Sequence, residues 1–452
     1  MTKDMTKGTE WKLILAFTLP LMAGNFLQQI YSLADSLVAG NFVGETALSA
    51  IGVVFPVTYL LLAVATGLTN GCGVITAQYF GAKDISSVRR AVSTTLFTTV
   101  GAAVLITILG YVLTRPVLVQ VLNTPETILP EAISYMRIYC IGLIFQFVYN
   151  AAASILRALG DSKSTLYFLV IAAVLNVVLD IVLAPYLGVK GIAWATVTAQ
   201  AGAALVSLIY LFKRITFLRY GAGEFTFDKS MFRLAMKMGI PTVIQQCCVA
   251  LGMILMQRLI NSFGEDAISG TTAAMRVESF VMVPIMMFFQ GLANFTGQNM
   301  GAGNIERVKR GFRQTLVMAL LCCVVIIALI LVFCTRIIGL FGLNEEACSL
   351  GAQYLRCLVS FFVIFCLMYV TNGVLQGSGD VMFPTLGSIA SLTTRVVVAN
   401  LLAAFTAVGY ASVYVSIPVG WVVGTSIVFI RFLSGRWKEK GLVNREKQGS
   451  AD

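Results

Sequence analysis

The sequence predicts an all-α integral membrane protein with 12 transmembrane helices in two six-helix bundles. Three observations predict this fold. The 452 residues are 58% hydrophobic and only 12% charged, whereas soluble domains are about 25% charged. Apolar runs of about 20 residues, enough for a helix to cross a bilayer, recur along the chain. The two halves of the sequence also resemble each other at a constant spacing.

Each half holds six apolar spans, and these runs are too long for the alternating pattern of a membrane β-barrel. The spans are expected near residues 13–37, 46–70, 91–113, 131–155, 164–185 and 191–212, then near 239–261, 267–296, 314–335, 349–373, 384–406 and 410–431. These spans predict an N-lobe at 1–212, a charged linker at 213–238, a C-lobe at 239–432 and a tail at 433–452.

The distribution of Lys and Arg predicts the orientation, because cytoplasmic loops of membrane proteins are rich in both. If the N-terminus is cytoplasmic, only Arg115, Lys190 and Arg336 among the loop residues fall on the outer side. We therefore expect both termini in the cytoplasm and a multi-pass protein of the plasma membrane. The net charge of +11 then reflects topology and does not indicate nucleic-acid binding.

Several residue types that enzymes and metal proteins use are scarce or scattered. The chain contains no histidine, and its ten cysteines form no CxxC pair, which argues against a disulfide framework or a zinc site. No nucleotide-binding loop or catalytic cluster is recognisable. We expect no enzyme activity and no cofactor. The expected protein is a monomer in the lipid bilayer that transports by a secondary mechanism.

The internal repeat becomes visible when the sequence is shifted by about 220 residues. The segment Gln78–Asp84 then matches Gln298–Asn304, and Arg89-Arg90 matches Lys309-Arg310. The segment Leu156–Asp161 matches Leu375–Asp380 at a shift of 219. An even number of spans gives both copies the same orientation, so the pseudo-two-fold axis should run along the membrane normal. Transporters with such parallel repeats bind their substrate between the bundles near the midplane.

Three acidic residues fall deep inside predicted spans: Asp35, Asp180 and Glu278. An ionised carboxylate there costs about 2.5–3.5 kcal/mol even on insertion scales, so such residues commonly hold a cation or carry a proton. Asn176 and Asp180 are spaced i, i+4, which places both on one helix face. With Asp35 they would form an oxygen-rich site suited to Na⁺ or a shared proton, and apolar surroundings would favour the protonated carboxyl.

Two further groups of polar residues lie inside the spans. Gln28 and Tyr31 share one stripe of the first span with Asp35. In the second half, Glu278 is the acidic candidate and Arg276 is close in sequence, although a spacing of two residues places them on different helix faces. A neighbourhood of Glu278 with Arg276 or with Arg395 remains open at this point.

The pattern of motifs resembles the multidrug and toxic compound extrusion (MATE) transporters over essentially the whole chain. The resemblance rests on the repeated Gly-Ala-x-Asp/Asn loops, Leu156–Asp161, Asn176-Val-Val-Leu-Asp180 and Gly191-Ile-Ala-Trp-Ala-Thr196. It implies an antiporter that exports organic, often cationic and amphiphilic, compounds in exchange for Na⁺ or H⁺. It also implies a cation site at Asp35, Asn176, Asp180 and Thr196, within a cavity that includes Gln28, Tyr31 and Asn150.

Two other transporter classes stay in consideration. The loop Gly81–Arg90 is similar to a loop of major facilitator transporters, although the spacing of its basic residues differs. The arginines inside the spans would also suit a lipid-linked oligosaccharide flippase of related fold, which needs a cationic cavity. Drug binding distinguishes the efflux transporter from the flippase, which would bind a lipid pyrophosphate.

Overall fold

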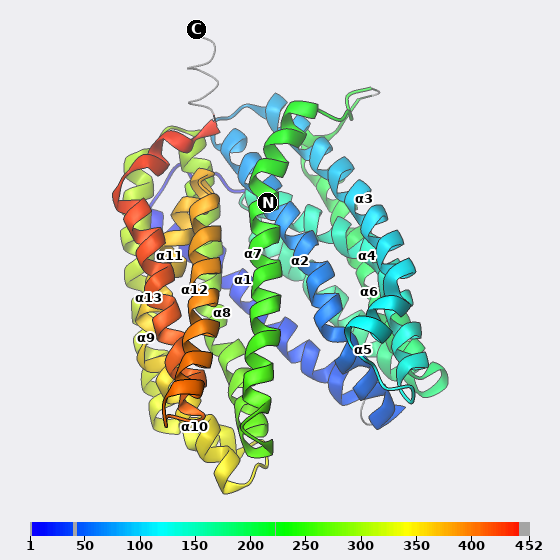
Figure 1. The fold of residues 1–452 in the computed structure, drawn as a ribbon. Helices are drawn as coiled ribbons and strands as arrows, with labels where there is room; N and C mark the ends of the chain where they lie inside the picture. The colour runs from blue at the N-terminus through cyan, green and yellow to red at the C-terminus, as the bar shows by residue number, and fades with distance from the viewer. Residues whose placement is uncertain (1, 39–42, 222, 443–452) are drawn as a thin grey trace. The chain divides into compact units, whose positions relative to one another are not determined.

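The computed structural model describes residues 2–38, 43–221 and 223–442, and the side chains of 32–38 and 45–48 lie outside that description. Helices account for nearly all of the described chain, and Figure 1 shows them as long rods joined by short turns. The first half holds α1 (Glu10–Val38), α2 (Glu45–Gly81), α3 (Ile85–Pro116), α4 (Leu129–Ala158), α5 (Ser162–Leu187) and α6 (Val189–Arg214).

The second half repeats this order with one additional break. It holds α7 (Lys229–Asn261), α8 (Glu265–Gly301), α9 (Ile305–Gly339), α10 (Glu345–Ser360), α11 (Phe362–Ser378), α12 (Met382–Phe405) and α13 (Ala411–Leu433). Short helical segments lie at Val117–Val121, Thr216–Leu218 and Arg436–Lys440. Eleven of the described helices are long and apolar enough to cross a membrane, and the bent pair α10 and α11 makes up to 12. The predicted helical membrane fold is confirmed.

The predicted span at 349–373 is not one continuous helix. The axes of α10 and α11 differ by 52°, and Phe361 lies between them. No proline or glycine marks this break in the sequence. The Ser360 hydroxyl donates a hydrogen bond to the Arg356 carbonyl at 2.7 Å, a local contact that bends helices. With only 16 residues, α10 is too short to cross the bilayer alone.

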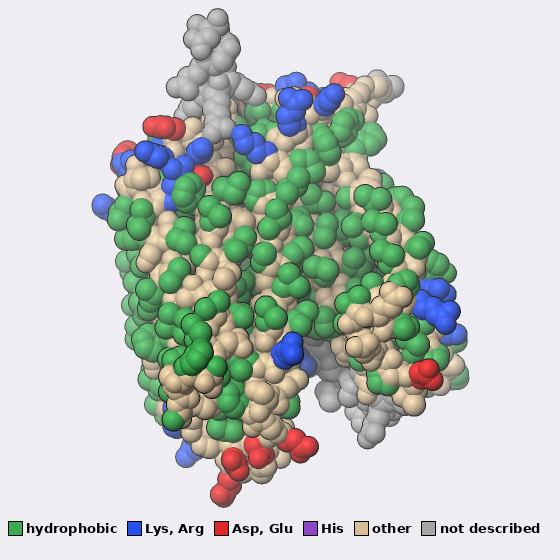
Figure 2. Space-filling view, viewed as in Figure 1, with side chains coloured by type: hydrophobic (Ala, Val, Ile, Leu, Met, Phe, Trp, Pro, Cys, Tyr) green, Lys and Arg blue, Asp and Glu red, His purple; other side chains and the backbone are tan. Residues whose placement is uncertain are grey.

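Hydrophobic side chains cover the helices along their lengths, and Figure 2 shows charged side chains near helix ends. This distribution fits helices whose flanks face lipid. The helix starts are stabilised by local hydrogen bonds. Asp84 accepts the Ser87 backbone N–H at 3.0 Å at the start of α3. Burial raises the pKa of the Asp84 carboxyl, but the hydrogen bonds from Ser87 and the nearby Arg90 outweigh this and lower it below its ordinary value.

The described chain divides into two compact units. The N-terminal unit contains the first four residues and Ala23–Gln246, and the C-terminal unit contains Met5–Met22 and the chain from Cys247 onward. In the N-terminal unit α4 packs against α2, α3 and α6, and α5 packs against α6. In the C-terminal unit α8 packs against α9, α10 and α11, while α12 packs against α13. Unlike the expected lobes, each unit takes part of α1 and part of α7.

Candidate functional site

The candidate cation site of the N-terminal unit lies on α5 and α6. Gly188 joins these helices with a positive φ of 58°, a conformation that glycine adopts without strain. A Cβ atom at Gly191 would lie 2.4 Å from the Leu183 carbonyl oxygen, so glycine there allows the start of α6 to approach the end of α5 closely. This short connection places the two helices side by side.

Close packing of α5 and α6 brings Asn176 to Thr196. The Asn176 side-chain amide donates to the Thr196 hydroxyl oxygen at 3.3 Å, and that hydroxyl donates to the Ile192 carbonyl at 3.1 Å. The Asn176 amide nitrogen is the donor in the first bond, and its side-chain carbonyl oxygen is an atom of the type that ligates hard cations. The structure therefore joins two of the four residues assigned to the cation site.

Asp180 follows Asn176 by one helical turn on α5. Its side chain is completely buried, and Asn176 is only 2% exposed. A buried carboxylate in a span requires hydrogen bonds, a proton or a cation to offset the loss of water. The position and burial of Asp180 therefore suit a coupling-ion residue. Asp35, the other expected acid, lies on α1, but its side chain is outside the described part of the structure.

The expected cavity residues differ in their surroundings. Gln28 is exposed on α1, whereas Tyr31 on the same helix and Asn150 on α4 are partly buried. The Asn150 amide donates to the Gln146 carbonyl within α4 at 2.8 Å, which turns the amide along its own helix. Asn150 therefore has a hydrogen-bond partner within its own helix. Its role in a substrate cavity stays a prediction.

The C-terminal unit brings Glu278 on α8 to Tyr354 on α10. The Tyr354 hydroxyl donates to the Glu278 carboxylate at 2.8 Å, and an Arg395 guanidinium nitrogen on α12 donates to the same hydroxyl at 3.5 Å. The Arg276 side chain is exposed on the surface of α8, whereas Glu278 is directed toward Tyr354. Of the two neighbourhoods left open by the sequence, the structure favours the one with Arg395, through Tyr354.

Tyr354 is a residue that sequence reasoning missed. It occupies the repeat position of Tyr135, and the segment Tyr354-Leu-Arg356 matches Tyr135-Met-Arg137. A buried tyrosine with one polar end needs a hydrogen-bond partner, but nothing in the sequence indicates that this partner is Glu278.

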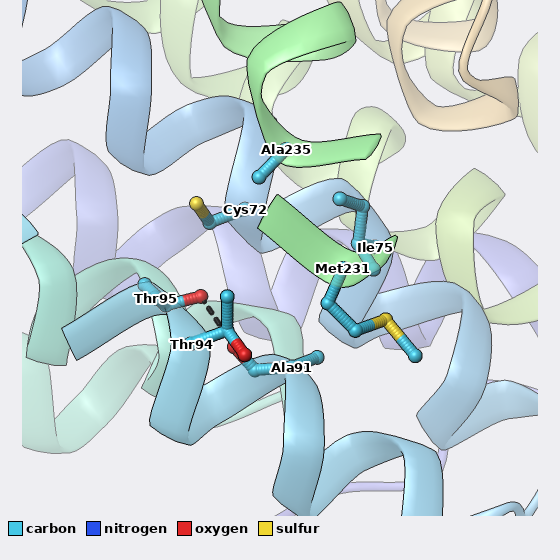
Figure 3. A pocket seen from close by; sticks show the side chains of 7 residues that line it. All are labelled: Cys72, Ile75, Ala91, Thr94, Thr95, Met231 and Ala235. Atoms are coloured by element: carbon cyan, nitrogen blue, oxygen red, sulfur yellow. Dashed lines mark hydrogen bonds between the residues drawn. The ribbon is translucent and has the colours of Figure 1, made fainter. Parts of the chain in front are cut away.

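A small cavity of about 10 Å³ lies elsewhere in the N-terminal unit, among α2, α3 and the first turns of α7. Figure 3 shows Cys72, Thr94, Thr95 and Met231 around it, with the Thr95 hydroxyl donating to the Ala91 carbonyl. This volume holds about one water molecule, so the cavity cannot bind an organic compound. Among the described residues, no group of three or more Cys, Asp or Glu side chains is arranged to hold a metal ion.

Comparisons with known proteins agree with one another. The family model described as MatE matches residues 20–182 and 241–401. The probable multidrug resistance protein YpnP of Bacillus subtilis is 30% identical over 96% of this chain and 97% of its own. The probable multidrug resistance protein YoeA of the same organism is 28% identical over 97% of both chains. A crystal structure of a MATE protein in the straight conformation matches with a TM-score of 0.90 and 24% identity, covering 97% of this chain and all of that one.

Proposed function

This chain belongs to the MatE family of multidrug efflux transporters, and from that premise we propose that it is a secondary antiporter that exports organic cations in exchange for Na⁺ or H⁺. The observation that carries the proposal is the fully buried carboxylate of Asp180 beside the hydrogen-bonded pair Asn176 and Thr196. The family match also removes the major facilitator alternative.

The proposed exchange rests on competition for charge in the N-terminal unit. When Asp180 is ionised, its negative charge attracts an organic cation, because Coulomb forces are strong away from bulk water. When Na⁺ or a proton neutralises the carboxylate, this attraction is lost and the drug is released. Binding free energies are reciprocal, so each ligand must weaken the affinity for the other. Asp35 on α1 is the proposed second carboxylate of this site.

The proposed orientation places both termini in the cytoplasm of a cell whose plasma membrane holds the protein. Its support is the positive charge of the linker and of the loops on the same side. With this orientation an inward Na⁺ or H⁺ gradient delivers the coupling ion from outside and drives export. The names of the relatives, which call them probable multidrug resistance proteins, support small organic compounds as the exported class. No enzyme activity and no cofactor enter this proposal.

The test is efflux of a fluorescent organic cation from proteoliposomes under an imposed Na⁺ gradient or pH gradient, each alone. We expect one of them to drive efflux by the wild-type protein. Asp180→Asn should lower that rate by at least about fivefold, which corresponds to about 1 kcal/mol in the transport barrier, and Asp35→Asn should act similarly. Glu126→Gln is the matched control, because it removes an exposed carboxylate between α3 and α4.

Two results would overturn the proposal. Full gradient-driven efflux by both Asp35→Asn and Asp180→Asn would remove the cation site. Binding or movement of a lipid-linked pyrophosphate, with no efflux of the organic cation, would favour the flippase alternative, for which Arg395 in a span is the supporting residue.

A further inference from the structure

The first helix of each half changes units within its own length. Residues of α1 up to Met22 belong to the C-terminal unit, and those from Ala23 belong to the N-terminal unit. In α7 the order is reversed, with the change between Gln246 and Cys247. Each helix therefore begins on one unit and ends in the other.

The start of α1 is held by a group of residues that we call the N-terminal clamp: Glu10, Trp11, Arg307, Arg310 and Gln314, all in the C-terminal unit. The Glu10 carboxylate lies 3.0 Å from the Arg310 Nε and 3.5 Å from an Arg307 guanidinium nitrogen. The Trp11 backbone N–H donates to the Gln314 side-chain oxygen at 2.7 Å. The Glu10 and Arg307 side chains are only 10% and 17% exposed, whereas Arg310 is 56% exposed, so water screens the pair with Arg307 less than the pair with Arg310.

The backbone before α1 is also bound to the C-terminal unit. The Met5 N–H donates to the Gln298 side-chain oxygen at 2.8 Å, and the Asn299 amide donates to the Met5 carbonyl at 3.2 Å. An Arg307 guanidinium nitrogen donates to the Gly8 carbonyl at 2.9 Å. These bonds extend the attachment over the segment from Met5 to Trp11.

The start of α7 is held by a second group, the linker clamp: Asp228, Arg90, Ser93, Thr94 and Thr226, all in the N-terminal unit. The Asp228 carboxylate lies 3.5 Å from an Arg90 guanidinium nitrogen. The Asp228 backbone N–H donates to the Thr94 hydroxyl at 3.0 Å, and the Ser93 hydroxyl donates to the Thr226 carbonyl at 2.7 Å. The linker before α7 is therefore attached to α3.

Aromatic and cation–π contacts strengthen the attachment of the linker. The ring of Phe97 on α3 lies 5.0 Å from that of Phe225, and the Arg89 guanidinium lies 4.9 Å from the Tyr220 ring centre. The Tyr220 hydroxyl also donates to the Arg89 carbonyl at 2.7 Å. Such aromatic pairs add about 0.5–1.5 kcal/mol beyond area burial.

The two clamps are copies of each other in the internal repeat. A shift of 220 residues relates Arg90 to Arg310 and Thr94 to Gln314. In both copies the arginine pairs with an acid at the helix start, and the side chain at the second position accepts a backbone N–H there.

Two glycines at equivalent repeat positions allow a neighbouring helix to approach α1 and α7 closely. The contacts lie one to three turns after the clamped start of each helix. A Cβ atom at Gly71 on α2 would lie 2.6 Å from the Gly239 nitrogen on α7. Its repeat counterpart, Gly291 on α8, would bring a Cβ atom to 2.2 Å from the Thr18 hydroxyl on α1. Both helix starts are thus approached closely by a glycine at the same repeat position, against the backbone of α7 in one copy and against the Thr18 side chain of α1 in the other.

We propose that the two clamps are positioning devices for transport. The N-terminal clamp holds the start of α1 on the C-terminal unit, and the linker clamp holds the start of α7 on the N-terminal unit. The remainder of each helix belongs to the other unit. A rearrangement of the units then has to be absorbed inside α1 and α7. Pro20 in α1 and Pro241 in α7 lie between the clamped helix start and the residue where the helix changes units. Proline removes a helical hydrogen bond, so a helix can bend there. The inference rests on the proposed antiport, since α1 also carries Asp35.

The test uses Glu10→Gln and Asp228→Asn in the full-length protein. Asparagine caps a helix start about as well as aspartate, so Asp228→Asn removes the charge pair and keeps the hydrogen bonds from Ser230 and Met231. Glu306→Gln is the matched control, because it breaks a pair with Lys309 on the exposed surface of α9. For each protein, gradient-driven efflux of the fluorescent cation, its Kd, and hydrogen exchange of the starts of α1 and α7 are measured.

We expect each clamp variant to lower the gradient-driven rate about fivefold, which corresponds to about 1 kcal/mol in the transport barrier. We also expect it to speed hydrogen exchange at its own helix start and to leave the Kd within about twofold. Glu10→Asp, which keeps the negative charge beside Arg307 and Arg310, should retain most of the rate. Wild-type rates in both clamp variants, or a rate loss in Glu10→Asp as large as in Glu10→Gln, would overturn the inference. Absence of gradient-driven efflux in the wild-type protein would instead overturn the proposed antiport, while hydrogen exchange would still show whether the clamps hold the helix starts.

Discussion

Asn176 and Asp180 lie one helical turn apart on α5, where almost none of either side chain is exposed. The hydrogen bond from Asn176 to Thr196 ties this pair to α6. The Thr196 hydroxyl has two roles, because it accepts from Asn176 and donates to the Ile192 carbonyl. Removing this one hydroxyl therefore tests whether the Asn176 orientation matters.

Thr196→Val removes the hydroxyl with little change in shape. We expect it to lower the free energy of unfolding by about 1 kcal/mol, the net value of a typical hydrogen bond, and to weaken the ion dependence of efflux. Thr198→Val is the control, because Thr198 is exposed two residues further along α6. Thermal unfolding of the purified variants measures the first effect. An equal loss of stability in both variants would contradict the assigned role of Thr196.

The sequence predicted Asn176 and Asp180 from their spacing within an apolar span, because polar residues four apart share a helix face. Thr196 was assigned only through the family resemblance, since its approach to Asn176 depends on the turn at Gly188. Tyr354 was missed because the partner of Glu278 comes from α10, far away in the sequence. Contacts between distant helices depend on tertiary packing, which the spacing along one helix does not encode.

At the scale of helices, glycine determines how closely α2 and the first turns of α7 approach. A side chain at Gly71 would meet the backbone of Gly239, and backbone cannot rotate away as a side chain can. At Gly52 on the same helix, a Cβ atom would have no neighbour within 4 Å among the described residues. We therefore expect alanine to have opposite effects on stability at Gly71 and at Gly52.

Gly71→Ala should lower the free energy of unfolding by about 1–3 kcal/mol, the usual cost of forcing extra atoms into close packing. Gly52→Ala should leave stability unchanged or raise it by up to about 1 kcal/mol, because alanine favours helix over glycine. Thermal unfolding of both purified variants checks the pair. If Gly71→Ala is as stable as Gly52→Ala, the close contact of α2 with α7 does not exist in solution.

Sequence patterns located the helices well, and the expected lobe boundaries stay a prediction. Span length and hydropathy predicted the helices because both follow directly from the thickness of the bilayer. The break at Phe361 has no proline or glycine to mark it. The repeat was visible, but it relates equivalent residues and does not indicate which unit a helix start packs against. The expected lobes therefore kept α1 and α7 whole, whereas the structure divides both.

Across the whole molecule charged residues are few, and different groups of them lie in different places. Arg90, Arg310 and their acidic partners hold the helix starts. Asp180 is buried in the N-terminal unit, and Glu278 is bonded to Tyr354 in the C-terminal unit. In a chain with only 12% charged residues, each buried carboxylate is costly enough to require a reason. For Asp180 the proposed reason is exchange of a cation for a drug.

The most direct test of this exchange is the Kd of a fluorescent organic cation for the purified protein, measured over a range of Na⁺ concentrations and of pH. The account predicts that raising Na⁺ or lowering pH weakens wild-type binding by about fivefold or more, and that Asp180→Asn largely abolishes this dependence. A wild-type Kd that responds to neither ion, or an Asp180→Asn protein that responds as the wild type does, would contradict it.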